Sequence, residues 1–295
     1  MGDITKVSII TLTYNNYRLL EKAIRSITMQ SPPTHYEVEY LVVDDGSKEF
    51  DRAYVEGLLA GKNINYRIIV NEKNVGTVAS FNNAIRQSRG DIIIPLSADD
   101  EFFDPQVVND IVAFFESHPY QVITGLRQCE HADGRHEVVP TAQQRTLFNH
   151  RAALLEQTIF KRHIISGACT YYRRTIFDAV GFFSDEYRLL EDHPYYIKLL
   201  TQGYDIGLLE RVVIKYAVGG VASKKNKHPL LVADLQHLKQ YLLTGPLLTR
   251  MEKRRFYYFK TQRSRQRLYL APLYVDQLLW ALCRKITALW RRNAA

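Results

Sequence analysis

The sequence has few cysteines and no long apolar run. Its three cysteines, Cys129, Cys169 and Cys283, lie far apart in 295 residues, so we expect neither a disulfide framework nor a metal site built on paired cysteines. Isolated histidines such as His163 show no ligand spacing, and we interpret them as surface residues or as residues with satisfied hydrogen bonds. No stretch of about 18 consecutive apolar residues occurs, so no transmembrane helix is expected. The N-terminus lacks a signal-peptide pattern, because the strand-like segment Val7–Ile10 begins almost at once. These absences predict a cytoplasmic protein.

Two signatures of nucleotide-binding enzymes are also missing. No Gly-x-Gly-x-x-Gly sequence follows a predicted strand, which argues against an oxidoreductase that uses a dinucleotide. The segment after the first predicted strand, residues 11–17, contains neither glycine nor lysine. A nucleotidyltransferase would usually carry a basic, glycine-rich phosphate loop at that place.

Charge is unevenly distributed along the chain. The composition, 46% hydrophobic and 24% charged, is that of an ordinary globular protein. Residues 246–295 contain twelve lysines and arginines but two acidic residues, a net charge of +10, whereas the whole chain carries +8. The first 245 residues are therefore close to neutral, and the basic charge is concentrated in the C-terminal region.

Strand and helix patterns alternate through the first 100 residues, which predicts an α/β fold. Such alternation implies parallel strands joined by right-handed crossovers, so we expect a mostly parallel central sheet flanked by helices. Residues 130–151 are polar and lack any periodicity, and a loop is expected there. The expected strands are Lys6–Leu12, Tyr40–Val43, Ile64–Val70 and Asp91–Leu96, with helices at Arg18–Met29 and Thr77–Gln87.

Acidic residues follow one of these strands at the predicted carboxyl edge of the sheet. The apolar run Ile92–Leu96 ends shortly before Asp99 and Asp100, and open α/β folds bind ligands at this edge. Adjacent like charges repel, and a divalent cation that carries phosphate oxygens would compensate them. A solvated turn or a helix cap is the alternative, because aspartate also favours those positions.

Two further acidic pairs are Asp44-Asp45 and Glu191-Asp192. The first pair follows a predicted strand, where a carboxylate can accept hydrogen bonds from a base or a ribose, or can close an Asx turn. The second pair begins a predicted helix, so one of its carboxylates could be an N-cap. Taken alone, each pair leaves both interpretations open.

Two loops add polar groups to the same predicted edge. Residues 11–16 read Thr-Leu-Thr-Tyr-Asn-Asn and offer hydroxyls and an aromatic face that suit a nucleobase. Asn74-Val75-Gly76 precedes a predicted helix, and the N-terminus of a helix favours anions. Each loop is a weak signal by itself, and their order along the chain carries more information.

In that order the motifs resemble the motif set of the family 2 glycosyltransferases of GT-A fold, including bacterial polysaccharide and O-antigen sugar transferases. The resemblance covers residues 6 to 225 or thereabouts, and Ser166–Tyr187 is similar to the acceptor-side segment of that family. Two residues depart from the pattern. Ser97 stands where the family commonly has aspartate, and Phe81 stands where it often has arginine. The motifs that carry the resemblance are Val7–Asn15, Val42–Ser47, Asn74–Asn82, Leu96–Asp100 and Glu191-Asp192.

The resemblance implies roles for particular residues. Asp99 and Asp100 would hold Mn²⁺ or Mg²⁺ together with the diphosphate of the donor. Asp192 would be the catalytic base, with Glu191 beside it. Gly167 and Arg173 would lie on the acceptor side. The residues expected to bind the donor are Thr11, Tyr14, Asn15, Asp44, Asp45, Asn74, Gly76, Ser97 and Asp99.

The function implied by the resemblance is inverting sugar transfer. The donor would be a nucleotide-diphosphate sugar, with UDP expected, and the acceptor a hydroxyl of a glycan or a lipid-linked saccharide in surface polysaccharide biosynthesis. The metal would neutralise the leaving diphosphate, and a carboxylate would deprotonate the acceptor. The alternatives are a metal-dependent nucleotidyltransferase and a non-enzymatic module that binds membranes or nucleic acid through the basic C-terminal region.

The C-terminal region, residues 226–295, is expected to be helical and to follow a domain that comprises residues 1–225. The segment Leu273–Trp290 is apolar and aromatic but too polar to cross a bilayer. It suits a membrane interface, with Trp280 at headgroup level and cations facing anionic lipid. We expect peripheral contact at the inner face of the cytoplasmic membrane and no nucleic acid partner. A helical hairpin packed on the body of the protein, or a subunit interface, is the alternative.

Overall fold

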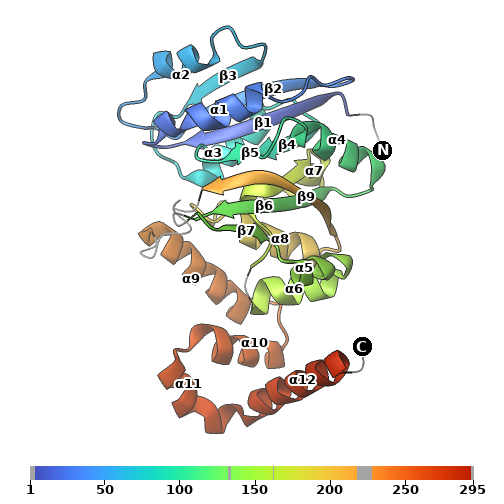
Figure 1. Ribbon diagram of the computed structural model, residues 1–295. Helices are drawn as coiled ribbons and strands as arrows, with labels where there is room; N and C mark the ends of the chain where they lie inside the picture. The colour runs from blue at the N-terminus through green and yellow to red at the C-terminus, as the bar shows by residue number, and fades with distance from the viewer. Residues whose placement is uncertain (1–3, 132–133, 162, 218–227, 294–295) are drawn as a thin grey trace. The chain divides into compact units, whose positions relative to one another are not determined.

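One β-sheet organises the N-terminal part of the chain, as the computed structural model in Figure 1 shows. The chain divides into two compact units, an N-terminal unit Met1–Asp234 and a C-terminal unit Leu235–Ala295. The domain boundary expected between residues 225 and 226 lies outside the described residues. The residues that the structure describes are 4–131, 134–161, 163–217 and 228–293.

Nine strands of the described residues form this sheet. Their order is β3-β2-β1-β4-β8-β6-β9-β5, and β7 pairs with β6 outside that path. The strands are β1 (Lys6–Thr13), β2 (Glu37–Asp44), β3 (Asn65–Val70), β4 (Ile92–Pro95), β5 (Glu101–Phe102), β6 (Val122–Glu130), β7 (His136–Val139), β8 (Thr170–Arg173) and β9 (Ile206–Ala217).

The first half of the sheet is parallel, as expected from the alternating pattern. β1 pairs in parallel with β2 and β4, and β2 pairs in parallel with β3. Ile92, Ile93 and Ile94 are fully buried, which explains why β4 reads as an unbroken apolar run. Beyond β4 the pairing is mixed, because β8 runs antiparallel to both β4 and β6 while β6 and β9 are parallel. The carboxyl ends of β1, β2 and β4 therefore open at one edge.

Helices cover both faces of the parallel half. The apolar residues of α1, at positions 20, 23, 24 and 27, join the core with those of α2 and α4. An aromatic cluster packs α3, α7 and α8 against β8, with the rings of Phe81 and Phe183 stacked at 5.4 Å. The α-helices of the N-terminal unit are α1 (Leu20–Thr28), α2 (Arg52–Leu59), α3 (Thr77–Gln87), α4 (Val107–Ser117), α5 (Ala142–Arg145), α6 (Arg151–Phe160), α7 (Thr175–Val180) and α8 (Asp192–Thr201).

The structure corrects the expectation of a loop at residues 130–151. Strand β7 pairs with β6 in this segment, and two short helical elements follow it, α5 and the 3₁₀ turn η2 (Thr146–Asn149). The capping box of α5, formed by Thr141 and Gln144, stabilises a helix too short to show a period. Helices α2 and α6 were also not expected. Two further 3₁₀ turns are η1 (Tyr17–Leu19) and η3 (Gly167–Cys169).

The C-terminal unit is helical, and polar contacts join its helices. Arg254 donates to Asp276 at 3.2 Å, and the guanidinium of Arg255 lies 4.2 Å from the ring centre of Trp280. Among the described residues, no helix is both long enough and apolar enough to cross a membrane. Helix α9 (Pro229–Thr244) contains the boundary between the units, and after it come α10 (Arg250–Phe256), η4 (Tyr257–Thr261), α11 (Ser264–Leu270), η5 (Ala271–Tyr274) and α12 (Val275–Asn293).

Candidate active site

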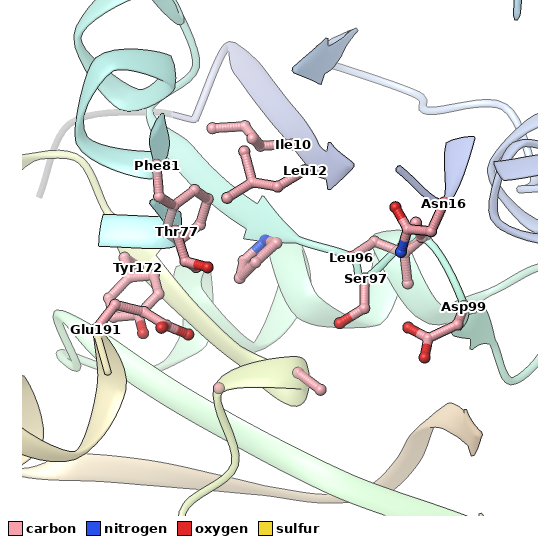
Figure 2. Close-up of a pocket in the computed structure, with 14 residues that line it drawn as sticks. Ile10, Leu12, Asn16, Thr77, Phe81, Leu96, Ser97, Asp99, Tyr172 and Glu191 are labelled. Carbon is pink, nitrogen blue, oxygen red and sulfur yellow. The ribbon is translucent and has the colours of Figure 1, made fainter. Parts of the chain in front are cut away.

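A pocket of about 280 Å³ opens where β1 and β4 end. Figure 2 shows Ser97 and Asp99 on one side of it and Glu191 with Tyr172 on the other. The pocket therefore brings together two acidic motifs that lie more than ninety residues apart in the sequence. The residues that line it are Ile10, Leu12, Asn16, Thr77, Phe81, Pro95, Leu96, Ser97, Ala98, Asp99, Gly167, Ala168, Tyr172 and Glu191.

Asp44 closes a turn at the end of β2 and connects it to the loop after β1. Its carboxylate accepts hydrogen bonds from the backbone N–H of Ser47 at 2.8 Å and from the Ser47 hydroxyl at 2.6 Å. The Ser47 hydroxyl in turn accepts from the N–H of Asn15 at 2.6 Å. Asn15 has a φ of 55°, a left-handed conformation that asparagine tolerates better than most residues. The Asx turn expected as one alternative for Asp44 is present and shapes the Tyr14–Asn16 loop.

Asp45 organises the loop that leads into α3. Its carboxylate accepts hydrogen bonds from the N–H groups of Val75 and Gly76, at 2.9 and 2.8 Å. It also accepts from the side chains of Asn71 and Ser80, at 3.0 and 2.8 Å. Four donors occupy this buried carboxylate, so its contribution to the site is to hold this loop in place. The contact with the donor that the resemblance implies for Asp45 stays a prediction beside this structural role.

Gly76 lets the loop before α3 approach the loop before α8. Its φ is 92°, and a Cβ atom built on it would lie 2.6 Å from the carbonyl oxygen of Arg188, so only glycine fits there. The guanidinium of Arg188 donates to the backbone oxygen and to the side-chain oxygen of Asn74, both at 3.0 Å. Asn74 and Gly76 thus connect the pocket wall at α3 to the segment that carries Glu191 and Asp192.

The acidic pair at the end of β4 is divided between the pocket and the interior. Asp99 lines the pocket beside Ser97, whereas Asp100 is buried, with 1% of its surface exposed, and does not line it. Burial raises the pKa of Tyr171, and the charge of Asp100 raises it further. Asp100 therefore lies next to β8, below the pocket. No group of three or more metal-ligating side chains occurs in the described residues.

Gly167 makes room for the third acidic pair. A Cβ atom built on Gly167 would lie 3.2 Å from Oδ2 of Asp192 and 3.4 Å from Oε1 of Glu191. Because Gly167 itself lines the pocket, its missing side chain leaves the Asp192 carboxylate just behind the pocket wall. The acceptor-side position expected for Gly167 is consistent with this placement.

Glu191 and Asp192 differ in charge although they are adjacent. Burial and the charges of Asp192 and Asp234 raise the pKa of Glu191 to about 8, so Glu191 holds a proton at neutral pH. Burial alone would also raise the pKa of Asp192, but His163 and His193 outweigh it and hold this pKa below its ordinary value. Asp192 is therefore the ionised member of the pair, the form that a general base requires.

Asp234 fixes the segment that precedes the pair, a role that no sequence pattern indicates. Its carboxylate accepts hydrogen bonds from the backbone N–H groups of Arg188, Leu189 and Leu190, at 3.0, 2.6 and 3.0 Å. Residue 234 is more than forty positions away from these partners. Nothing in its local sequence, within the amphipathic α9, distinguishes it from a surface acid.

Other residues expected at the site lie elsewhere. Arg173 is buried, and its guanidinium donates to the carbonyl oxygens of Phe115 and Tyr120, at 2.6 and 3.3 Å. These contacts join β8 to the end of α4, and the acceptor-side role expected for Arg173 stays a prediction. Thr11 is fully buried within β1 and does not line the pocket. Tyr14 is 45% exposed and leaves its ring accessible for stacking.

Comparison with known proteins places the chain among the glycosyltransferases. The family described as glycosyl transferase family 2 matches residues 8–181. The uncharacterized glycosyltransferase YwdF of Bacillus subtilis (strain 168) is 27% identical over 242 residues, which cover 80% of this chain and 81% of YwdF. The O-antigen chain rhamnosyltransferase RfbN of Salmonella typhimurium (strain LT2) is 25% identical over 220 residues, 72% of this chain and 66% of RfbN.

The fold is shared with a solved structure. The crystal structure of S. aureus TarS 1–349 in complex with UDP-GlcNAc superposes with a TM-score of 0.61 over 89% of this chain and 78% of TarS 1–349. The sequence identity is 18%, so this likeness shows a common fold.

The raised pKa of Glu191 predicts a pH dependence of stability that Glu191→Gln removes. Between pH 4.5 and about 8 the folded protein keeps a proton that the unfolded chain has lost. Rising pH therefore destabilises the wild type across this window, by no more than about 1.4 kcal/mol per pH unit for one proton. We expect Glu191→Gln to gain stability relative to the wild type as pH rises from 5 to 8, measured by urea unfolding. Glu210→Gln, at an exposed position of β9, is the control, and a pH-independent difference for Glu191→Gln would contradict the assignment.

Proposed function

Because the chain belongs to glycosyl transferase family 2, we propose that it transfers a sugar from a nucleotide-diphosphate donor with inversion at the anomeric carbon. The acceptor is a hydroxyl group of a glycan or a lipid-linked saccharide, and the pathway is surface polysaccharide biosynthesis. One observation carries the proposal. An ionised carboxylate, Asp192, lies behind the wall of the pocket that Asp99 lines from the opposite side.

The two sides of the pocket have different chemical tasks. The loops at the ends of β1 and β2 and the N-terminus of α3 form the donor side, where polar groups and an exposed Tyr14 ring suit a nucleoside. Asp192, on the other side, takes the proton from the acceptor hydroxyl. The acceptor oxygen then bonds to the anomeric carbon, and the bond from that carbon to the diphosphate oxygen breaks. The negative charge leaves with the diphosphate.

Direct displacement accounts for inversion. A single base that activates the acceptor permits attack from the face opposite the leaving group, whereas retention would need a second, nucleophilic carboxylate. Glu191 is the nearest carboxylate to Asp192 along the chain, and at neutral pH it holds a proton. A protonated carboxyl is a poor nucleophile, which supports one base and one displacement.

The residues of the donor side suit a divalent metal of the hard class. Mg²⁺ and Mn²⁺ commonly use one or two carboxylates, with phosphate oxygens and water as their remaining ligands. Asp99 supplies a carboxylate at the pocket surface, next to the hydroxyl of Ser97, so a cluster of three protein ligands is not required. When bound, the metal would stabilise the charge that develops on the leaving diphosphate. Asp100 is buried and does not line the pocket, so it would act by holding the turn that carries Ser97 and Asp99 in its conformation.

The relatives suggest which substrates to test first. TarS, with the same fold, was solved with UDP-GlcNAc, and we propose UDP as the nucleotide of the donor. RfbN is named for transfer of rhamnose to an O-antigen chain, and we propose an acceptor of this saccharide class. Thermal stabilisation by a panel of nucleotide sugars, followed by a transfer assay with the best of them, tests both parts.

The C-terminal unit supports peripheral membrane contact. The ring of Trp280 packs against Arg255 of α10 and Gln277 is buried, while Val275, Leu279, Leu282 and Ile286 of α12 are exposed. An exposed apolar stripe on a strongly basic unit suits the interface of an anionic membrane. Trp280 is 39% exposed although its ring also packs against Arg255, and its expected place at headgroup level stays a prediction. The side chain of Trp290 lies outside the described residues.

Asp192→Asn is expected to abolish transfer while leaving donor binding intact. Loss of a general base costs about 10²–10⁴-fold in rate, and the carboxamide retains the shape of the side chain. We expect kcat to fall within or beyond this range while the Kd of the donor, measured by calorimetry, changes less than about twofold. Asp178→Asn, at an exposed position of α7, is the matched control. Turnover of Asp192→Asn close to that of the wild type would remove Asp192 from this role.

Removal of divalent metal is expected to stop transfer. Dialysis against a chelator should abolish activity, and Mg²⁺ or Mn²⁺ should restore it. Asp99→Asn, which loses the pocket carboxylate, should raise the metal concentration for half-maximal activity by about tenfold or more. Asp104→Asn, beyond β5, provides the comparison. Full activity in excess chelator would show that the transfer needs no metal.

A single charge on the apolar stripe of α12 is expected to weaken membrane binding. Burial of the Leu279 side chain in the membrane would contribute about 1.5–3 kcal/mol to binding, and Leu279→Glu replaces this side chain with a carboxylate. Vesicle binding should therefore fall about tenfold or more. Thr287→Glu adds the same charge to the same helix at a polar position. Sedimentation with vesicles that contain anionic lipid measures both variants. Equal binding by Leu279→Glu and the wild type would exclude this face.

A further inference from the structure

We propose that His163 is a positioning residue for Asp192: its imidazole orients the carboxylate and keeps it in the ionised form that removes a proton from the acceptor. The inference rests on the proposed function, because it assigns a role relative to the base. It adds a residue that lies outside every motif on which the resemblance depends.

The geometry places His163 directly against the base. Its Nε2 atom lies 3.6 Å from Oδ2 of Asp192, and both side chains keep less than a quarter of their surface exposed. The imidazole ring lies parallel to that of His193, with centroids 4.4 Å apart and planes inclined by 10°. It also contacts the ring of Tyr196 at 5.6 Å. Packing on two rings fixes the plane of the imidazole, and hence the direction in which its nitrogens point.

The two oxygens of Asp192 have different partners. Oδ1 accepts a hydrogen bond from the backbone N–H of His193 at 2.6 Å. Oδ2 faces His163 and also lies 3.2 Å from the position of the missing Cβ of Gly167. The oxygen next to the pocket wall is therefore the one that His163 contacts. The histidine holds that oxygen while its remaining lone pair stays available to an acceptor hydroxyl.

His163 has no other hydrogen-bond partner within the described parts of the chain. Both of its ring nitrogens are buried, and neither makes a hydrogen bond there. A buried donor without a partner is destabilising, so the ring gains by approaching Asp192. At 3.6 Å the contact is an ion pair when His163 is protonated, and a movement of less than 1 Å would make it a hydrogen bond.

His193 is adjacent to the base but plays a different part. Its Nε2 atom lies 3.0 Å from the carbonyl oxygen of Thr158, so this nitrogen carries the proton and donates. The ring nitrogen Nε2 is directed toward α6, and the hydrogen bond from His193 to Asp192 comes from the backbone N–H. The charge of His193 lowers the pKa of Asp192 less than the contacts of His163 do, so His193 is a matched control with a similar ring and similar stacking.

The other titratable groups around His163 fit this assignment. Asp192 and Glu191 stand at the start of α8, and the hydroxyl of Tyr196 contacts that of Tyr172 at 3.1 Å. Burial raises the pKa of both tyrosines well above the ordinary range, so both stay neutral. Glu191 holds a proton at neutral pH. The Asp192 carboxylate is thus the one anion beside His163 among these groups, and burial would raise its pKa without the opposing effect of His163.

The test compares His163→Phe and His163→Gln with His193→Gln in the full chain. His163→Phe keeps the ring stacking and removes both nitrogens, so the pKa of Asp192 should rise. The acidic limb of the profile of kcat against pH should then move to higher pH by about one unit or more. At pH 7, kcat should be about tenfold lower, and the KM of the donor should change less than twofold. His163→Gln retains a donor but no charge, so it should recover part of kcat while keeping the shifted limb. His193→Gln should shift the limb much less.

A second measurement does not depend on catalysis and keeps the inference testable apart from the proposed function. Urea unfolding of His163→Gln, Asp192→Asn and the double variant should be non-additive, because the two side chains are in contact. Additive effects of the two substitutions, or equal limb shifts for His163→Gln and His193→Gln, would overturn the role of His163. If the wild type transfers no sugar but the coupling is present, the proposed function fails while the His163–Asp192 pair stands.

Discussion

Two adjacent carboxylates at the start of α8 cannot both be ionised beside an apolar pocket wall, and much of the site is arranged around this constraint. Glu191 keeps its proton because burial and two neighbouring acids disfavour a further negative charge. Asp192 loses its proton because two histidines and a backbone N–H compensate it. One negative charge in a fixed place results, and that place is next to the glycine gap at residue 167. The like-charge repulsion thus divides one dipeptide into a neutral member and an ionised member.

Other acids of the N-terminal unit accept hydrogen bonds from backbone N–H groups. This structural use of carboxylates helps to explain why acidic residues occur at the strand ends. Asp44, Asp45 and Asp234 each accept hydrogen bonds from backbone N–H groups of loops that border the pocket. A carboxylate with several such donors is satisfied and has little capacity left for a ligand. Asp99 differs because it faces the pocket. The chemistry at the edge of the sheet therefore depends on a few exposed carboxylates that are held in place by buried ones.

The parts of the fold that could be predicted from the sequence are those with local causes. Helix α3 begins and ends at the expected residues, Thr77 and Gln87, because a positive-φ glycine precedes it and its apolar period is regular. β4 was recognisable because a strand buried on both faces must be apolar throughout. The helical content of residues 130–151 depends on a capping box and on pairing with β6, which leave no period in the sequence.

Prediction of the site from the sequence was limited in the same way, because several of its contacts join residues that lie far apart in the chain. The order of the acidic motifs indicated which strand ends would meet, and the pocket joins Asp99 and Glu191 as that order suggests. Sequence could not separate the carboxylates that bind backbone from those that face the pocket, since both follow strands. Arg173 shows the same limit, because its partners are carbonyl oxygens more than fifty residues away. His163 and Asp234 act through contacts at separations of 29 and 44–46 residues, and no local pattern marks either one.

The C-terminal unit presents a different physical problem, because its helices meet through polar and cation–π contacts as well as through aromatic packing such as that of Tyr258 on Tyr274. Arg254 and Arg255 pack on Tyr274 and Trp280, and Gln277 of α12 is buried while Leu279 and Ile286 on the same helix are exposed. Guanidinium–aromatic packing can join two helices while cations remain in contact with water. The exposed apolar side chains of α12 do not contribute to this packing. Exposed apolar surface costs free energy in water, which is the physical argument for the membrane contact proposed for this helix.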